Sequence, residues 1–330
     1  MKTLRRNEVP AAYREPYIFS RYRACGSTLG TCLLSAFHAT NETLNFWTHF
    51  VPFLVQALVT SQHVLDPSFR SDPFNWPFLV FALSGCCYML GSSLAHMFAS
   101  YSEFCHYICY FIDYSTVSIY VMGLCVAYKE YAFPRYAMNS AIHRIYLPMV
   151  FLLSILFSAT SCGTRYSRHH LLRIHGRKVT FPAYFAWCNL PIAYRALFGS
   201  SSSSTADAYY IAQTAAAIVA AATYGLHLPE ALAPGRFDFI AHSHQLFHLS
   251  TVAMTYCQYR SLSMEMHDHR EALLDLSGMP TFAETFGILL ANVFLHGILI
   301  VGLGLWLRKP GQLAKIHHLE EAPSIPPKKD

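Results

Sequence analysis

The chain has 330 residues, of which 53% are hydrophobic and only 13% are charged, and its formal net charge is +5. Ordinary soluble domains carry about 25% charged residues, so this chain lacks the polar surface that a soluble globule of its size needs. The composition excludes a disordered chain, a collagen, a coiled coil and a nucleic-acid-binding module, since the basic residues do not gather on one face. It predicts an all-α membrane protein with several spanning helices and no nucleic acid among its partners.

Eight apolar segments follow one another along the chain, each long enough for a spanning helix of about 20 residues. They cover residues 46–65, 77–99, 105–127, 144–163, 179–198, 208–228, 239–259 and 284–306. The expected organisation is an N-terminal segment at 1–45, a multi-spanning helical domain at 46–306 and a C-terminal tail at 307–330. Residues 1–40 hold no clean apolar stretch with a cleavage site, so no signal peptide is expected.

The fifth segment is the least regular of the eight. It contains Pro182, Asn189, Pro191 and Arg195. A kinked helix is expected there, because neighbouring helices can satisfy the backbone groups that a proline frees inside a membrane. A seven-helix bundle without the last segment is the main alternative, although residues 284–306 are strongly apolar and are followed at once by two basic residues.

The basic residues predict the orientation of the helices. If the N-terminus lies in the cytosol, most of the 24 Lys and Arg residues fall on the cytosolic side. They lie in the N-terminal segment, in the loop at 165–178, at Arg236 and in the C-terminal tail, whereas the smaller outer group includes Arg70, Lys129 and Arg135. Membrane proteins concentrate Lys and Arg in their cytosolic loops, so both termini are expected in the cytosol.

Ionisable residues inside apolar segments are costly unless they are paired, so each needs a reason. His96 lies near the end of the second segment, Asp113 in the third, and His244 and His248 near the start of the seventh. An i,i+4 histidine pair alone carries little weight among 18 His, because two hydrogen-bonded histidines give the same pattern. Alternating helix directions, however, place all four residues at one depth near the cytosolic surface, at about 1.5 Å per residue. This shared depth predicts one site.

Three neutral imidazoles are a typical zinc ligand set, and three protein ligands leave a fourth position for water. We therefore expect His96, His244 and His248 to bind zinc. Asp113 is expected to orient the water or accept its proton, and Ser92, one turn before His96, to hydrogen-bond within the site. His242 is a weaker candidate ligand, because it points away from His244 around the helix.

Four motifs in this order resemble the progestin and adipoQ receptor family. They are Asn41-Glu42-Thr43-Leu44-Asn45-Phe46-Trp47-Thr48-His49, Ser92 to His96, the region from Ser102 to Asp113, and Gly235 to Asp238 followed by Ser243 to His248. The resemblance covers the chain from Asn41 to the eighth segment, and residues 228–238 are more similar to the membrane progestin receptors, gamma or delta, than to the adiponectin receptors. It implies a seven-helix adiponectin-receptor-like bundle plus an eighth C-terminal helix, a cytosolic N-terminus, and zinc held by the three histidines with Asp113 beside the zinc water.

The resemblance also implies a function, for which three hypotheses remain open. The first is a plasma-membrane receptor that binds a steroid, a progestin or another lipid, contacts membrane lipids and signals to cytosolic partners, with G proteins expected among them. The second is a zinc-dependent hydrolase of lipid amides similar to alkaline ceramidases, with Asp113 and Ser92 as catalytic candidates. The third is a purely structural zinc that ties the second and seventh segments together. The residues alone do not point to a steroid.

Overall fold

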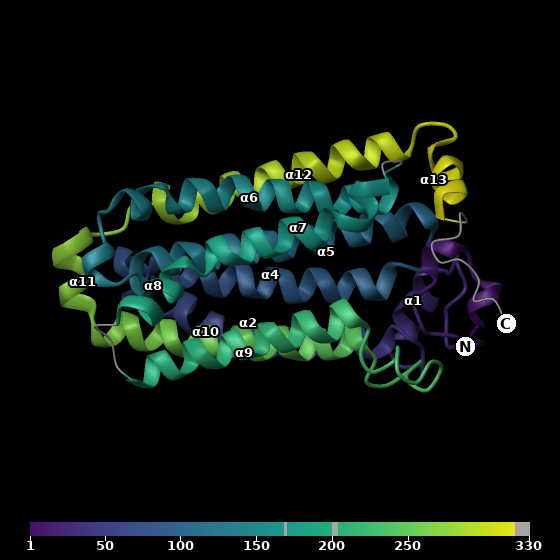
Figure 1. The fold of residues 1–330 in the computed structure, drawn as a ribbon, viewed down its shortest axis with the longest axis horizontal. Helices are drawn as coiled ribbons and strands as arrows, with labels where there is room; N and C mark the ends of the chain where they lie inside the picture. Colours follow the sequence, from purple (N-terminus) through teal and green to yellow (C-terminus); the bar gives the residue numbers. More distant parts are fainter. Residues whose placement is uncertain (168–169, 200–203, 321–330) are drawn as a thin grey trace.

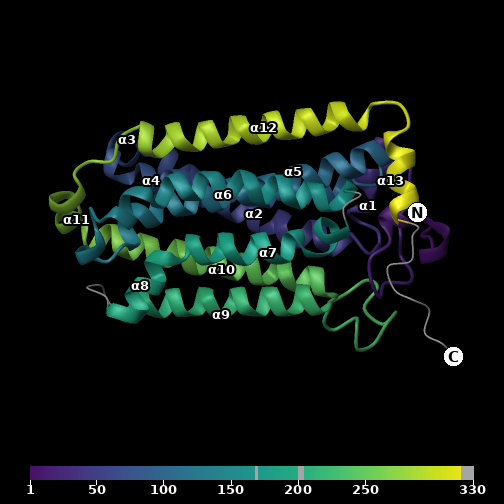
Figure 2. The ribbon, with the colours of Figure 1, turned by 45° about the horizontal axis from the view of Figure 1, so that its top comes forward.

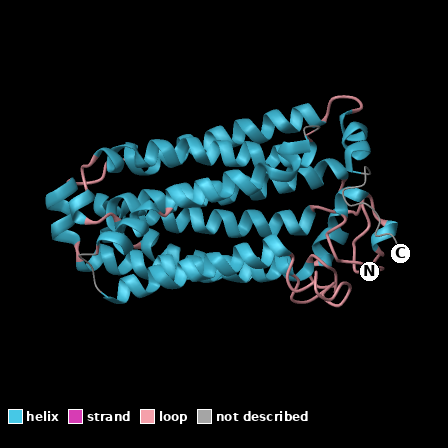
Figure 3. Cartoon of the chain, viewed as in Figure 1, coloured by secondary structure: helices cyan, strands magenta, loops and turns pink. Residues whose placement is uncertain are grey.

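The computed structural model describes residues 1–167, 170–199 and 204–320, so residues 321–330 of the expected tail lie outside the described part. The described residues form helices and loops but no β-strand (Figure 3). The helices are α1 Leu29–Ser35, α2 Thr43–Leu65, α3 Pro67–Ser71, α4 Trp76–Phe98, α5 Glu103–Ala127, α6 Ala141–Tyr166, α7 His170–Cys188, α8 Leu190–Phe198, α9 Ser204–Leu226, α10 Ser243–Asp268, α11 Arg270–Ser277, α12 Ile288–Leu307 and α13 Gln312–Glu320.

The long helices lie side by side along the long axis of the molecule (Figure 1). The N-terminus, α1 and α13 lie at one end of this bundle, and α3 and α11 lie at the other (Figures 1 and 2). Four helical stretches are long and apolar enough to cross a membrane, Pro73–Phe98, Glu103–Ala132, Ala141–Tyr166 and Ala283–Leu307. The chain is therefore an integral membrane protein of the all-helical class.

Helices α2, α7, α9 and α10 run in the same bundle but are not among these four stretches. At about 1.5 Å per residue, the 26 residues of α10 reach across a bilayer core of about 30 Å. Several polar residues of α10 face inward, because Gln245, Thr255, Gln258 and Ser261 are all buried. Polar side chains that face the interior lower the mean hydropathy of a helix, although the lipid does not contact them.

The closest helix crossing joins α4 and α5, and glycines permit it. A Cβ atom added at Gly91 would lie 2.7 Å from the Thr116 Oγ1 atom, and one added at Gly123 would lie 2.1 Å from the Ser84 Oγ atom. Small residues let helix backbones approach closely where no hydrophobic effect drives association. The two glycine contacts therefore let α4 and α5 pack closely at two points along their interface.

Helix α12 packs on the outside of the bundle against α5 and α6 (Figure 2). Its inner face makes polar contacts, because Asn292 Nδ2 donates to Ser154 Oγ at 2.7 Å and His296 Nε2 lies 2.9 Å from Ser158 Oγ. Its outer face is apolar and exposed, with Phe294 among the largest side chains. Interhelical hydrogen bonds of this kind attach a helix inside a bilayer, where apolar contacts alone discriminate poorly between helix and lipid.

The structure breaks the expected fifth helix in two. Helix α7 ends at Cys188 and α8 begins at Leu190, with Asn189 between them. Pro191 lies in the first turn of α8, where the missing N–H costs nothing, so the chain restarts a helix rather than continuing one. Pro182, in contrast, is accommodated inside α7. The expected kink is therefore a break at Asn189.

The expected limits of the seventh segment, 239–259, are wrong at both ends. Helix α10 begins only at Ser243, because Ala241 has a positive φ of 64° and the buried Glu230 carboxylate accepts the Ser243 N–H at 2.7 Å. At the other end the helix continues to Asp268, since the buried Glu265 is paired and does not stop it. Hydropathy alone marks neither event.

Candidate functional site

The three candidate histidines meet at the end of the bundle that holds the N-terminus, here called the histidine end. His96 lies in the last turn of α4, and His244 and His248 lie one turn apart at the start of α10. Their candidate ligand nitrogens all lie within 4.8 Å of one another. The ring centroid of His96 is 4.9 Å from that of His244 and 5.0 Å from that of His248. The structure therefore brings the three histidines into one cluster that can hold a metal ion.

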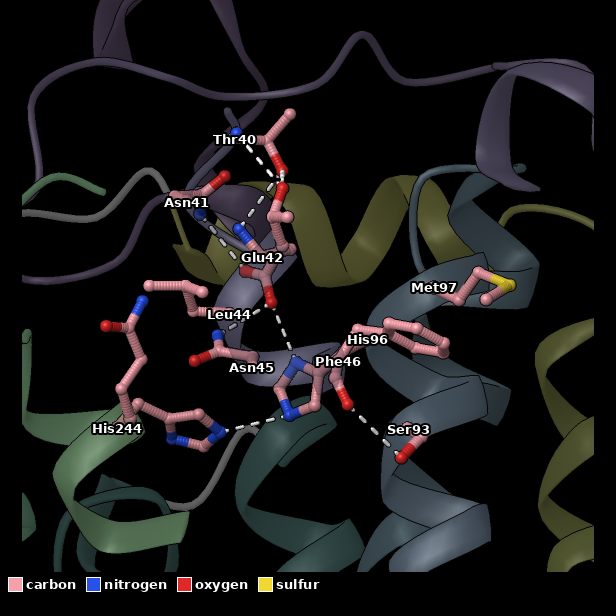
Figure 4. A network of polar contacts seen from close by, with 12 residues as sticks. Thr40, Asn41, Glu42, Leu44, Asn45, Phe46, Ser93, His96, Met97 and His244 are labelled. Atoms are coloured by element: carbon pink, nitrogen blue, oxygen red, sulfur yellow. Dashed lines mark hydrogen bonds and ion pairs between the residues drawn. The ribbon is translucent and has the colours of Figure 1, made fainter. Parts of the chain in front are cut away.

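The nitrogens of this cluster fit a metal better than they fit one another. The Nε2 atoms of His96 and His244 face each other at 3.1 Å (Figure 4). His96 Nδ1 lies 2.7 Å from a Glu42 carboxylate oxygen, and His248 Nδ1 lies 3.1 Å from the Asn45 carbonyl oxygen. Imidazole nitrogens backed by a carboxylate or a carbonyl are the usual donors to zinc and related divalent metals.

Asp113 and Ser92 lie beside this cluster. Asp113 is half-buried on α5, and its carboxyl interacts with the Ser92 hydroxyl and with the His96 ring. Ser92 is buried on α4, one turn before His96. The structure thus places all five candidate residues at one end of the bundle, with Asp113 contributed by a different helix from the three histidines.

The structure adds Glu42 and His49 to the surroundings of the cluster, two residues of the Asn41 to His49 motif to which the sequence assigns no part in the metal site. Glu42 stands immediately before α2, and burial would raise the pKa of its carboxyl, but its hydrogen bonds to His96 and Asn45 and the charge of Arg23 hold that pKa below the usual range. The buried His49 ring stacks on the His248 ring, with centroids 3.8 Å apart and planes 10° from parallel. The place of Glu42 in that motif is its signal in the sequence, but the motif does not indicate the contact with His96.

His242 takes no part in the cluster. It precedes α10, and its Nε2 atom lies 3.1 Å from the Asn41 carbonyl oxygen. This contact joins the start of α10 to the segment before α2. The sequence predicts His242 as a weaker candidate ligand because of its position around the helix, and it lies outside the cluster.

A small cavity opens beside the histidines. Its volume is about 50 Å³, which holds a few water molecules but lies well below the roughly 300 Å³ at which drug-sized ligand pockets begin. Besides His96 and His244, its lining includes Glu15, Asn45, Tyr110, Arg165 and His227. The cavity therefore provides room for water next to the cluster.

The N-terminal segment closes this end of the molecule. Phe19 N–H and Ser20 Oγ donate to the two carboxylate oxygens of Asp238, at 3.0 and 2.6 Å. Arg23 donates to the carbonyl oxygens of His96, at 2.6 Å, and Met97, at 2.7 Å. These carbonyls belong to the last turn of α4, where backbone acceptors lack intrahelical partners, so Arg23 caps the helix that carries His96.

A second buried polar cluster lies at the opposite end, here called the arginine end. Arg195 Nη2 on α8 lies 2.6 Å from a Glu265 oxygen on α10 and 2.9 Å from an Asp207 oxygen on α9. The guanidinium group also lies 4.9 Å from the centre of the Tyr210 ring. Three helices are thus joined by one cation between two anions.

Comparison with known proteins agrees with this architecture. Residues 37–259 match the haemolysin-III related family. The chain is 36% identical over 296 residues to human "Membrane progestin receptor gamma", covering 87% of this chain and 89% of the relative. It is 36% identical over 328 residues to mouse "Membrane progestin receptor delta", covering 93% and 92%, and 31% identical over 272 residues to the human alpha receptor, covering 81% and 78%. The chain therefore belongs to the haemolysin-III related family and, within it, to the progestin and adipoQ receptors, as the four sequence motifs predict.

Proposed function

We propose that this protein is a membrane receptor for a progestin or a related lipid, acts in the plasma membrane and signals to cytosolic partners, G proteins among them. The similarity over most of the chain to receptors named for progestins carries this proposal. A lipid ligand reaches such a protein from the bilayer, between helices, rather than through the water-sized cavity beside the histidines. The test is saturable binding of labelled progesterone to the purified protein, and its absence at micromolar concentration contradicts the steroid assignment.

The proposed topology has both termini in the cytosol. It divides the chain into a cytosolic segment at 1–45, eight spans in a seven-plus-one helical domain at 46–306, and a cytosolic tail at 307–330. The distribution of basic residues supports it, because Arg14, Arg165 and Arg308 all lie at or near the histidine end, which then faces the cytosol. An epitope tag at the N-terminus should be inaccessible to antibody in intact cells and accessible after permeabilisation; the reverse pattern contradicts the orientation.

We further propose that His96, His244 and His248 bind zinc. When bound between three imidazoles, zinc lowers the pKa of a water molecule and polarises a carbonyl group. In this proposal Asp113 accepts and returns a proton beside the cluster and Ser92 orients its carboxyl, which the hydrogen bond between the two side chains supports. A carboxylate next to an incomplete set of three ligands favours a second function, hydrolysis of a lipid amide, over a purely structural metal.

Metal analysis of the purified protein separates these alternatives. Wild type should carry about one zinc per chain, and the variant with His96, His244 and His248 all replaced by Ala should carry none. Asp113→Asn should keep its zinc and lose ceramide hydrolysis. Zinc-loaded wild type without turnover contradicts the hydrolase, and loss of the folded state on chelation supports the structural role.

A further inference from the structure

One short segment contacts two of the three histidines through the nitrogens that face away from the cluster. Asn41–Asn45, at the start of α2, provides none of the candidate metal ligands itself. Its Glu42 carboxylate lies 2.7 Å from Nδ1 of His96 on α4, and its Asn45 carbonyl oxygen lies 3.1 Å from Nδ1 of His248 on α10 (Figure 4 draws the Glu42 contact). Ligands from two different helices therefore depend on the same five residues.

The contact with Asn45 decides which nitrogen of His248 carries the hydrogen. A carbonyl oxygen only accepts hydrogen bonds, so Nδ1 of His248 donates and Nε2 keeps its lone pair. The Thr48 hydroxyl also lies 3.0 Å from Nδ1, but it donates to the Leu44 carbonyl at 2.7 Å and so offers its own lone pair to the ring. Both neighbours select the same tautomer.

The contact with Glu42 does the same for His96. Asn41 Nδ2 donates to one oxygen of the Glu42 carboxylate at 3.0 Å, and Asn45 Nδ2 donates to the other at 2.9 Å. Two amide donors favour the ionised carboxylate, which then accepts the Nδ1 hydrogen of His96. The Nε2 lone pair of His96 consequently faces His244 and the centre of the cluster.

We propose that Asn41–Asn45 is the template of the metal site and that Glu42 is its main positioning residue. The segment sets the tautomers of His96 and His248 in advance, while His244 Nε2 supplies the hydrogen bond that a metal replaces. Glu42 also places a negative charge behind His96, where it partly balances a divalent cation in a low-dielectric region. This inference rests on the proposed zinc site and goes beyond its ligands.

The test compares zinc affinity in Glu42→Gln with that in a matched control. Glu42→Gln keeps the shape of the side chain but removes the charge and weakens the acceptor, so the zinc dissociation constant should rise about 10- to 100-fold. Glu15→Gln alters another glutamate of the same cavity, one that makes no hydrogen bond or ion pair with the three histidines, and it should stay within about twofold of wild type. Glu42→Asp, which keeps the charge, should fall between the two.

Cobalt substitution supplies a readout that a merely structural role does not change. The visible absorption of Co²⁺ reports the geometry and donor strength of its ligands as well as their number, so Glu42→Gln should show an altered spectrum at saturating cobalt while its metal-free melting temperature stays that of wild type. Equal zinc affinity and equal cobalt spectra in wild type and Glu42→Gln overturn the inference alone. A wild-type protein that binds neither metal overturns the proposed zinc site together with it.

Discussion

At the arginine end each buried charge faces a charge of opposite sign, whereas at the histidine end three like imidazoles face one another. Arg195 lies between Glu265 and Asp207, so its charge is balanced by the protein itself. The Nε2 atoms of His96 and His244, in contrast, lie 3.1 Å apart, and only one hydrogen fits between them. The charges of the arginine end are thus paired within the protein, whereas the histidine end gathers three imidazoles that can hold a metal ion.

The largest expected effect removes one imidazole. His248→Ala should abolish stoichiometric zinc binding, with an affinity loss greater than the roughly 100-fold that removing a hydrogen-bond partner of a ligand costs. Zinc content and chelator competition measure it. The control is His242→Ala, another buried histidine at the same end that contacts Asn41 instead of the cluster. Retention of full zinc affinity in His248→Ala would remove the distinction between the two ends.

The next effect breaks the arginine end. Glu265→Ala removes one of the two carboxylates beside Arg195 and should lower the free energy of unfolding by about 3–5 kcal/mol, because a buried charge loses a partner. Glu265→Gln should cost less, since it keeps a hydrogen-bond acceptor. Unfolding in detergent measures both. Zinc content should stay that of wild type, and a loss of zinc in Glu265→Ala would show that the two ends are coupled.

The smallest effects are expected for two glycine substitutions at the interface of α4 and α5, one near each end of the bundle. Gly91→Ala places a methyl group against Thr116 near the histidine end, and Gly123→Ala places one against Ser84 near the arginine end. Each should cost about 1–3 kcal/mol of stability through overpacking. Only Gly91→Ala should also weaken zinc binding, because it displaces the turn that precedes His96. Gly302→Ala, where nothing lies within 4 Å, serves as the control and should change neither property.

Hydropathy predicts the limits of some helices closely and those of others poorly. Helix α4 lies at Trp76–Phe98 against an expected 77–99, because its own sequence is apolar over most of that length. Helix α10 departs from its expected limits because Glu265 is stabilised by Arg195, a residue 70 positions away in the chain. The break at Asn189 can be predicted from Pro191, because proline disrupts a helix locally whatever its distant neighbours are.

The candidate site divides in the same way. His96, His244 and His248 can be predicted to share a site because helix direction alone sets their depth in the bilayer. Glu42 cannot be predicted from its own surroundings, because its partner His96 is 54 residues away and the contact exists only after α2 and α4 have packed. Candidate metal ligands can be recognised in a sequence by their residue type, whereas residues that orient those ligands are recognised only from the packed structure.

The hydrogen bonds of Arg23 to the last turn of α4 have a practical consequence for chimeric proteins. Its guanidinium group holds the carbonyl oxygens of His96 and Met97, and Glu42 holds the His96 ring, so two residues before the first long helix fasten one histidine. Exchanging N-terminal segments between relatives therefore exchanges part of the histidine site as well. A domain swap between relatives that is meant to leave the histidine site intact should cut the chain before Arg23 rather than at the hydropathy boundary near residue 45.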